Sequence, residues 1–437
     1  MKKFLRYVLL LVCLITYSAG SAFAQSTTGK ISGKVTDAKT KEALPFITIV
    51  LEGTNLGAAS DIDGFYTINN VSPGTHKLKV SAVGYQTSVI QNVKVNIGLT
   101  TNIDIQLNDM NVTLNAEVVI TAERPLVQKD LTASTSIVGQ EMISSLPVTE
   151  IRDVLQLQAG MTVSGGDLHL RGGRAGQIAY QIDGVPVTDA YDGNNVIDVA
   201  TQSIQELQVV SGAFNAEFGQ AMSGIVNIVT KDGSNNFTGN VQAYTGTYMS
   251  NRENIFWGIK KFRPSAVRNV EGSLSGAIVP DKLFFFVNGR YFYNQGYLFG
   301  KRDYLTTDLS TKQPDGSYLV TQHGDGALVS MNPNTRYNGQ GKLTYRLTSG
   351  VKLTYNYIYD YQNYKDFNQG NRLTPDNNLD RFRKGITNTL GINHALSSNT
   401  FYMLNLSYFF KNYQHYLFKD IYTGDPSRPT LYVDNTL

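Results

Sequence analysis

From residue 237 onward, apolar and polar residues alternate along the chain. In the stretch 351–359 the odd positions are apolar or aromatic and most even positions are polar (Val351, Leu353, Tyr355, Tyr357 and Tyr359 against Lys352, Thr354, Asn356 and Ile358). A period of two is that of a β-strand, whose successive side chains point to opposite faces. The pattern predicts seven strands, at 237–247, 268–278, 283–293, 340–348, 351–360, 386–396 and 400–411.

Short and long connections alternate between these predicted strands. Residues 279–282, 349–350 and 397–399 form short turns, whereas 248–267, 294–339 and 361–385 are long. Strands with one apolar and one polar face, joined by such alternating connections, are typical of transmembrane β-barrels. A soluble β-sandwich is the alternative, but it gives no reason for the alternation in length.

Aromatic residues concentrate in the same part of the chain. Tyr and Phe number 12 in residues 1–236 and 34 in residues 237–437, where Trp257 also lies. Barrel strands carry aromatic residues at both membrane interfaces, so this distribution favours a barrel. Plugged barrels of this kind close at ~22 strands, so seven strands predict an incomplete barrel and an N-terminal fragment of a longer protein.

The first 24 residues have the pattern of a secretory signal peptide. Three basic residues precede an apolar run at 7–17, and small residues at 22–24 form a cleavage site. Cleavage removes three of the 38 basic residues and no acid, which leaves 35 basic against 35 acidic residues. No excess charge then indicates a nucleic-acid partner. Cleavage also removes Cys13, so the mature chain has no disulfide and no thiolate metal site.

Between residues 25 and 107, short strands alternate with turns. Runs at 30–36, 47–52, 65–68, 76–82, 87–95 and 102–107 are separated by turn pairs such as Asp63-Gly64, which indicates a small β-sandwich. The acidic run at 61–64 suggests a calcium loop, but an EF-hand register puts Ala59 and Asn70 where acids are required. We interpret the run as a turn between two strands.

Residues 126–232 mix short helices and strands, which indicates a domain of α+β character. The segment 150–158 has apolar residues at helical spacing and ends before Gly160. Strand-like runs at 168–171 and 178–182 flank a glycine-rich turn and by composition form a hairpin. The chain is therefore predicted to be mostly β: a small β-sandwich, an α+β domain and the first seven or so antiparallel strands of an incomplete transmembrane β-barrel.

The sequence carries none of the common catalytic motifs. It has no Gly-x-Ser-x-Gly elbow, no His-Glu-x-x-His pair and no Gly-Lys-Ser/Thr phosphate loop. The five histidines fall in separate elements without metal-ligand spacing, and His169 is interpreted as packed or solvated rather than facing a ligand. We predict no catalytic residue, no metal, no cofactor and no enzyme.

Three ordered blocks between residues 168 and 231 resemble one known domain. They are Arg171-Gly172 followed by Ile182-Asp183-Gly184-Val185-Pro186, then the run SIQELQVV at 203–210 with Ser211-Gly212 and Glu217-Phe218-Gly219, and then the run GIVNIVTK at 224–231. Together they resemble the plug domain of TonB-dependent outer-membrane receptors. Upstream, five short motifs resemble the carboxypeptidase-regulatory-like domain, which often precedes the plug in receptors of the Bacteroidetes type. They lie at residues 33–37, 42–45, 52–54, 61–65 and 83–85.

The resemblance divides the chain into a signal peptide (1–24), a carboxypeptidase-regulatory-like sandwich (25–107), a linker (108–125), a plug (126–232) and the N-terminal part of a barrel (233–437). It implies a transporter in outer-membrane lipid, with its N-terminal domain in the periplasm. The transporter would take up a large nutrient (a siderophore, oligosaccharide, peptide or similar) with energy from a TonB-type periplasmic coupling protein. The alternative is an outer-membrane adhesin or a secretion-linked barrel without nutrient uptake.

The resemblance also assigns candidate site residues. The tract before Pro125 looks like a TonB box, which the coupling protein binds by strand addition (Glu117, Val118, Val119, Ile120, Thr121 and Ala122). The alternative is that this tract is the first strand of the plug.

A second group of candidate residues forms the plug motif (Arg171, Gly172, Asp183, Gly184 and Gly219). Arg171 is interpreted as an ion-pairing residue that seats the plug in the barrel wall, with substrate contact as the alternative. Residues 124–126 (Arg-Pro-Leu) stand where the polysaccharide-uptake branch carries Gly-Tyr-Gly, which argues against a surface lipoprotein partner.

Overall fold

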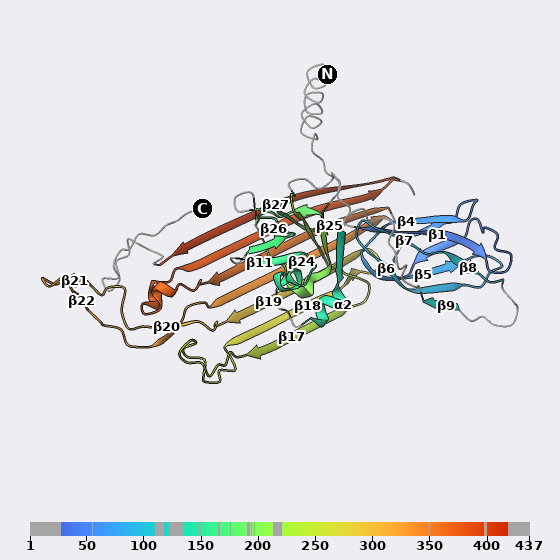
Figure 1. The fold of residues 1–437 in the computed structure, drawn as a ribbon. Coiled ribbons are helices and arrows are strands. Elements are labelled where there is room, and N and C mark those ends of the chain that lie inside the picture. Colours follow the sequence, from blue (N-terminus) through green and yellow to red (C-terminus); the bar gives the residue numbers. More distant parts are fainter. Residues whose placement is uncertain are drawn as a thin grey trace, which may run out of the picture.

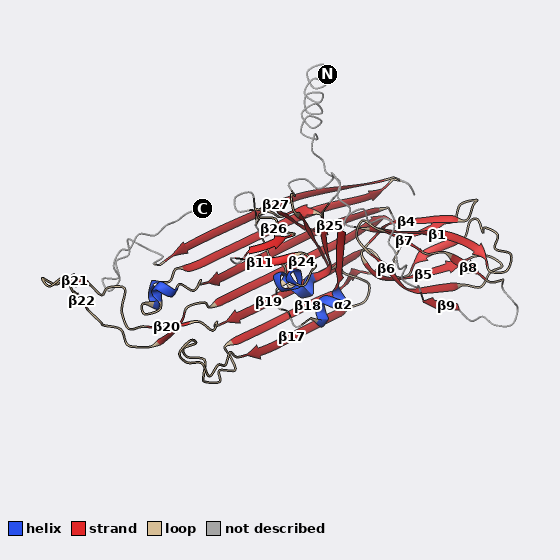
Figure 2. Ribbon diagram, viewed as in Figure 1, coloured by secondary structure: helices blue, strands red, loops and turns tan. Residues whose placement is uncertain are grey.

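The computed structural model describes residues 28–54, 56–109, 118–121, 134–146, 148, 150–164, 167–174, 176–189, 193, 195, 197–212, 221–348, 350–396 and 400–417. They form a β-sandwich, an α+β plug and a seven-stranded sheet (Figure 1). The plug lies against one face of the large sheet, and the sandwich lies beyond one end of it. Strands dominate the fold (Figure 2). Within these ranges no helix has the length and apolar character needed to cross a membrane. The predicted signal peptide lies outside them.

The seven-stranded sheet, called the wall below, is an antiparallel meander in which each strand pairs with its neighbours in sequence. Its strands confirm the seven predicted from the alternating pattern. Some begin earlier than predicted, because their inward polar positions continue into stretches that the sequence assigned to loops. The strands are β17 (Thr238–Gly246), β18 (Val267–Val279), β19 (Leu283–Asn294), β24 (Asn334–Thr348), β25 (Val351–Tyr364), β26 (Asp380–Ala395) and β27 (Phe401–Tyr416).

The two faces of the wall differ as the alternation predicts. In β24, Arg336 and Lys342 face the plug and are 3% and 6% exposed, whereas Tyr337 and Leu343 on the other face are 45% and 43% exposed. A polar inner face and an apolar outer face are the arrangement of a transmembrane barrel. The wall therefore meets the plug with polar and charged side chains.

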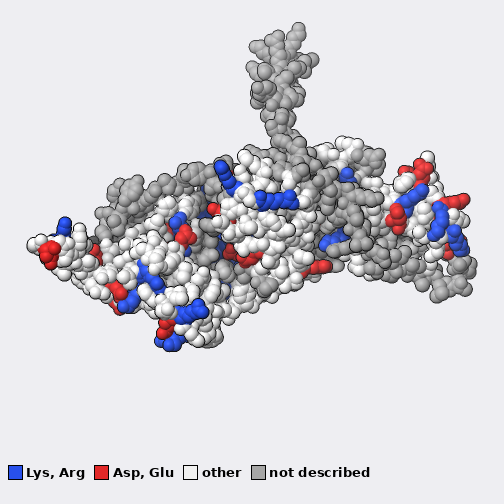
Figure 3. Space-filling view, viewed as in Figure 1, with Lys and Arg blue, Asp and Glu red and all other residues white. Residues whose placement is uncertain are grey.

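The long connections gather at the end of the wall opposite the sandwich (Figure 1). An ion pair joins the connections 294–339 and 361–385, since Arg302 Nε lies 2.6 Å from Asp376 Oδ2. A cation–π contact joins 361–385 to 248–267, since the Arg372 guanidinium lies 3.5 Å from the ring centre of Trp257. Charged side chains are visible over these loops and over the sandwich (Figure 3). The loops contain β20 (Phe299–Lys301), β21 (Ser310–Lys312), β22 (Tyr318–Val320), β23 (Leu328–Ser330), η2 (Gln369–Asn371) and η3 (Pro375–Asn377).

The predicted sandwich is formed by two sheets, with the strand orders β4-β1-β7 (with β8 also on β1) and β3-β2-β5-β6-β9. The predicted turn at 61–64 is confirmed, because Asp61 Oδ1 accepts the backbone N–H groups of Asp63 and Phe65. The predicted strand at 102–107 is divided in two, since the Asp104 side chain accepts the Lys34 N–H. The strands are β1 (Gly29–Asp37), β2 (Thr48–Leu51), β3 (Gly57–Ala59), β4 (Phe65–Val71), β5 (Gly74–Ser81), β6 (Ser88–Val95), β7 (Thr100–Asn102) and β8 (Ile105–Leu107).

Strand β9 (Val118–Thr121) carries the central part of the predicted TonB box. It pairs in parallel with β6 and so becomes the last strand of the sandwich's second sheet. The tract thus lies in the sandwich sheet, although its segment was predicted as a linker with a plug strand as the alternative. Glu117 and Ala122, at the two ends of the tract, lie outside the described residues.

The plug contains a five-stranded sheet with the order β10-β15-β16-β13-β14. The helix predicted at 150–158 is confirmed as α3, which begins with a capping box in which the Asp153 carboxylate accepts the Glu150 N–H. The plug elements are β10 (Ser134–Gly139), α2 (Gln140–Ser145), α3 (Ile151–Gln156), β11 (Met161–Ser164), β12 (Asp167–Leu170), β13 (Ile178–Ile182), β14 (Val185–Pro186), η1 (Thr201–Ser203), β15 (Ile204–Ser211) and β16 (Gly224–Thr230).

The predicted hairpin between 168 and 182 is wrong. Strand β12 pairs with β11, whereas β13 pairs with β14 and, in parallel, with β16. Arg171, Gly172 and Gly176 have φ values of 50°, 76° and 82°. These left-handed residues redirect the chain out of one sheet and into another, so the turn does not bring its flanking strands together.

Candidate functional site: the interface between plug and wall

Ionic contacts hold the plug against the inner face of the wall. The plug has its own apolar core, built around side chains such as Leu155, Ile178 and Ile228. Among the described residues, Ile358 of β25 is the one wall side chain in that core. The remaining contacts between plug and wall are largely hydrogen bonds and ion pairs, which include two clusters and a separate pair between Lys411 of β27 and Asp189.

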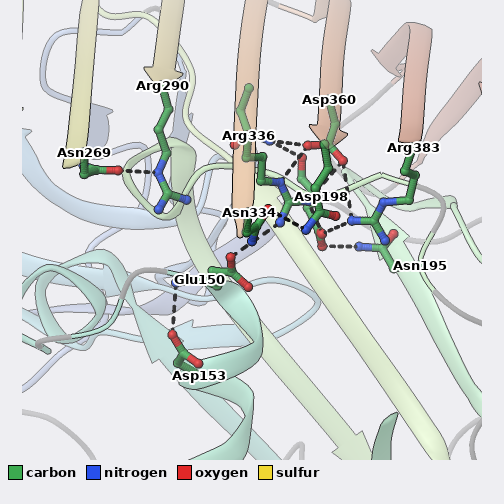
Figure 4. Close-up of polar contacts among 12 residues, drawn as sticks. Glu150, Asp153, Asn195, Asp198, Asn269, Arg290, Asn334, Arg336, Asp360 and Arg383 are labelled. Carbon is green, nitrogen blue, oxygen red and sulfur yellow. Dashed lines mark hydrogen bonds and ion pairs between the residues drawn. The ribbon is translucent and has the colours of Figure 1, made fainter. Parts of the chain in front are cut away.

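The first cluster is centred on Arg336 of β24 (Figure 4). Its Nε lies 2.8 Å from Asp360 Oδ1 and its Nη2 lies 3.0 Å from Asp360 Oδ2, a two-pronged pair between neighbouring wall strands. From the plug, Asp198 contacts the same guanidinium, and Glu150 Oε1 lies 3.8 Å from its Nη1. Arg383 of β26 adds a second cation, 2.8 Å from Asp198 Oδ2.

The charges in this cluster stabilise one another away from water. Asp360 is 0% exposed and Arg336 is 3% exposed. Burial acts against the charged form of Asp198, but Arg336 and Arg383 outweigh it and hold the pKa of that carboxyl well below its ordinary value. Asp198 therefore remains ionised throughout the physiological pH range.

The second cluster surrounds Lys342 of β24. Its Nζ lies 2.8 Å from Asp232 Oδ1 and 3.2 Å from Asp183 Oδ2, and Lys352 Nζ of β25 lies 2.6 Å from Asp232 Oδ2. Both aspartates belong to the plug side of the interface. Burial again opposes the charge of Asp232, but the two lysines outweigh it and hold the pKa of Asp232 below its ordinary value.

Asp183 is the acid of the Ile-Asp-Gly-Val-Pro block, and the fold gives it four contacts. It accepts the Thr230 N–H at 2.8 Å and the Thr230 hydroxyl at 2.6 Å, which ties the ends of β13 and β16 together. From the wall, Asn356 Nδ2 donates to Asp183 Oδ2 at 2.8 Å, in addition to the Lys342 ion pair. Asp183 and Gly184 have φ values of 49° and 75°, the backbone of a tight two-residue turn.

The remaining residues of the predicted plug motif do not contact the wall in the same way. Arg171 is exposed, and its guanidinium lies beside Gly212 of the plug. Within the described ranges, Asp183, Asp198 and Asp232 make the ion pairs to the wall that were expected of Arg171. Gly172 takes part in the left-handed turn after β12, and Gly219 lies outside the described residues.

Sequence reasoning did not single out most members of the two clusters. Asp198 lies between the blocks that resemble the plug signature, and Asp232 directly follows the last of them. The wall residues did carry a signal, because Arg336, Lys342 and Lys352 are cations at inward positions of alternating strands. A cation facing the inside of a barrel needs a partner there, so such positions can point to the plug interface.

A cavity of about 720 Å³ lies beside the Lys342 cluster. The plug and wall contribute Asp232, Lys342 and Lys352, and the sandwich contributes the turn at 72–77. His169 is not part of it, since its Nδ1 donates to the Gly173 carbonyl of its own turn at 2.9 Å. The cavity is thus lined by sandwich, plug and wall together.

A sheet of alternating strands with a polar inner face and a plug ion-paired to that face is the arrangement of a plugged outer-membrane barrel protein. Residues 31–120 match the CarboxypepD_reg-like domain, and residues 127–226 match the TonB-dependent Receptor Plug Domain. The chain therefore carries the plug domain of TonB-dependent receptors, which are outer-membrane proteins, behind a CarboxypepD_reg-like domain.

The chain is also similar to individual TonB-dependent proteins. The chain is 25% identical over 286 residues to the TonB-dependent transporter Oar of Myxococcus xanthus, a match that covers 61% of this chain and 27% of Oar. It is 25% identical over 333 residues to the TonB-dependent receptor P3 of Formosa agariphila, covering 67% of this chain and 32% of that protein. The chain thus spans about a third or less of the length of these relatives.

Among solved structures, the siderophore receptor PirA of Pseudomonas aeruginosa is similar, with a TM-score of 0.45 and 16% sequence identity. That match covers 64% of this chain and 41% of PirA.

Proposed function

We propose that this chain is part of a transporter that takes up a large nutrient across the outer membrane with energy from a TonB-type coupling protein, and that it is not an enzyme. The observation that carries the proposal is the nature of the plug interface. Apart from Ile358 of β25, the described side chains of the plug's apolar core come from the plug itself, and the plug meets the wall mainly through polar and charged groups. Such a plug can move along the wall while losing only the Ile358 contact from its apolar core.

The energetics of buried ion pairs support this view. Desolvation offsets much of the attraction within a buried pair, so paired charges add little net stability compared with apolar packing. If the plug shifts and water enters, the separated charges regain hydration. The interface is thus specific in register yet suited to opening, whereas a permanent seal would favour apolar packing.

We further propose an orientation and a route to the membrane. The signal peptide at 1–24 directs export, and the sandwich and the short turns of the wall lie in the periplasm. The long connections then face outward and contribute to binding a siderophore, an oligosaccharide, a peptide or a similar molecule. In this proposal the domain boundaries are those expected from the sequence, except that β9 of the predicted linker extends the sandwich sheet, and β9 is the coupling segment.

The coupling protein would bind the tract at 117–122 by strand addition, so a proline there should uncouple the plug. In the full-length receptor, Ile120→Pro removes a backbone donor and fixes φ, whereas Ile120→Val keeps the strand. Plug movement can be measured without a known nutrient, through labelling of Gln181→Cys by a membrane-impermeant maleimide in cells. Gln181 is 2% exposed in the seated plug, so labelling reports its displacement.

Labelling should be faster in energised cells than in cells treated with a protonophore, and Ile120→Pro should abolish that difference while Ile120→Val keeps it. If the labelling rate of the parent does not depend on the proton-motive force, the result would instead favour an adhesin or secretion-linked barrel. If Ile120→Pro labels like the parent, the coupling segment lies elsewhere.

A further inference from the structure

The sandwich holds the candidate coupling strand at a defined position. Four residue pairs align β9 with β6 in parallel, from Ser88 opposite Val118 to Gln91 opposite Thr121. In the sheet order β3-β2-β5-β6-β9, this places β9 at the edge. Within the described part of the chain, the second edge of β9 has no strand beside it.

An edge strand that is already extended is prepared for strand addition. A free peptide must lose about 1–2 kcal/mol of backbone entropy per ordered residue before it can pair. Pairing with β6 orders β9 in advance, which lowers the cost of binding a further strand. The partner would then need only the N–H and C=O groups of the outer edge.

The other end of β6 contacts the plug. Strand β6 ends at Val95, and in the following turn the Ile97 N–H donates to Glu206 Oε1 of plug strand β15 at 3.1 Å. Glu206 is 2% exposed, so this contact is enclosed between the two domains. Strand β6 therefore pairs with the coupling strand near one end and leads, at its other end, into a turn that contacts the plug.

A second group of contacts fixes the sandwich at the same end of the wall. Lys352 Nζ, which binds Asp232 at the plug, also lies 3.3 Å from Ser72 Oγ of the sandwich. Lys30 Nζ lies 5.6 Å from the ring centre of Phe401 in β27. The sandwich is thus seated on plug and wall rather than attached only through the chain.

We propose that β9 stays in the sandwich sheet during coupling, so that the coupling protein adds an extended strand to its outer edge and the pull reaches the plug through β6 and Glu206. This inference rests on the proposed function, because it takes β9 as the segment that the coupling protein binds. Since β6 and β9 run parallel, a pull along β9 is borne at the same time by all the hydrogen bonds that join it to β6. The rival mechanism requires β9 to leave β6 before the partner can bind.

A reversible disulfide bond between β6 and β9 distinguishes the two mechanisms, because it prevents β9 from leaving β6. Residues opposite each other in neighbouring strands lie within the Cα separation of ~4.4–6.8 Å that a disulfide spans. Gln91 is only half-buried, unlike Ser88, Val89 and Ile90, so Gln91→Cys with Thr121→Cys is the suitable pair. The chain's own cysteine, Cys13, lies in the predicted signal peptide.

The readout is capture of the full-length receptor by the purified periplasmic domain of the coupling protein. The oxidised double variant should be captured within about twofold of the reduced form, with both single-cysteine variants as controls. Capture that is lost on oxidation and regained on reduction would show that β9 must leave β6, and so would overturn the proposal. Failure of the disulfide to form would overturn it as well. A parent receptor that is not captured at all would remove the proposed function itself.

The contact with the plug is tested through Glu206. Glu206→Gln keeps an oxygen that accepts the Ile97 N–H, whereas Glu206→Ala removes it. In energised cells, labelling of Gln181→Cys should fall severalfold in Glu206→Ala and stay near the parental rate in Glu206→Gln. Capture by the coupling protein and the amount of receptor in the outer membrane should be equal in both. Parental labelling in Glu206→Ala would show that the pull bypasses this contact.

Discussion

At the scale of single residues, the interface is organised by complementary charge. The plug side supplies Asp183, Asp198 and Asp232, and the wall supplies lysines and arginines at inward positions of β24, β25 and β26. Each acid contacts at least one cation and each of the buried cations has more than one oxygen partner. Removing one member therefore leaves a charge without compensation in a poorly hydrated place.

Replacing Lys342 should be costly for that reason. Lys342→Met leaves Asp183 short of a cation and Asp232 with Lys352 alone, and loss of one partner from a buried pair costs about 3–5 kcal/mol. The measurement is urea-induced release of the plug in the full-length receptor, followed through exposure of Gln181→Cys. Lys312→Met, the same change in the exposed strand β21, should leave the midpoint unaltered.

The double variant Lys342→Met with Asp183→Asn should lose less free energy of plug release than the two single variants lose in sum, because it removes a charge that Lys342→Met leaves uncompensated. Strict additivity would show that these two groups do not interact.

Glu206 should make the seating of the sandwich depend on pH. Burial raises the pKa of Glu206 from 4.5 to about 7, although the Ile97 N–H and the nearby Lys94 favour the carboxylate. A carboxyl with a raised pKa binds its proton more tightly in the folded state, so its contribution is full below pH 4.5 and decreases as pH rises towards 7. Between these limits the free energy that holds the sandwich against the plug should decrease by about 1.4 kcal/mol per pH unit.

Glu206→Gln has no titrating group and should flatten this dependence. The measurement is the rate at which protease cuts between sandwich and plug in the purified receptor, compared at several pH values with a protease active over the range. An equal slope in the parent and in Glu206→Gln would contradict the assignment to this carboxyl.

At the scale of elements, β9 shows how a short tract acquires a partner. Val118–Thr121 is apolar and β-branched, which predicts a strand but does not say which sheet it joins. The fold pairs it with β6 of the sandwich. The same four residues therefore contribute to the stability of the sandwich as well as to the proposed coupling.

The sandwich should accordingly be more stable with β9 than without it. Residues 25–121 should fold in isolation and unfold at a higher urea concentration than residues 25–109. With about 0.5–1.5 kcal/mol net for each hydrogen bond gained, the difference should be about 1–3 kcal/mol. Ile120→Pro should abolish the difference and Ile120→Val should keep it. Equal midpoints for the two lengths would show that β9 does not pair stably with β6.

At the scale of the whole molecule, the wall is an open sheet. Strands β17 and β27 each pair on one side in the described part of the chain, and both present backbone groups at an edge. A strand edge in lipid is strongly unfavourable, because no water is present to bind its N–H and C=O groups.

The 1–437 chain by itself should therefore fail to form a heat-resistant barrel in detergent or in outer-membrane vesicles. The test is gel migration before and after boiling, because closed barrels migrate differently when they are kept folded. Heat-modifiable migration of the 1–437 chain would show that its edges close, for example between copies of the chain.

The sequence by itself determined the elements whose pattern is local. The period of two in β24 and β25 predicted both the strands and the face each side chain takes, because alternation follows directly from strand geometry. The helix beginning at Ile151 and the turn at Asp61 likewise depend on neighbouring residues. The plug blocks likewise indicate a TonB-dependent receptor plug domain from local sequence, and residues 127–226 match that domain.

Only the tertiary structure decided which elements meet. The turn after Leu170 leads into a different sheet, β9 joins the sandwich, and Asp198 finds Arg336 138 residues away. Such pairings depend on the relative placement of whole sheets, and no local periodicity encodes that. An inward cation such as Lys342 can be predicted to need a partner, but the fold alone selects Asp183 and Asp232 to provide it.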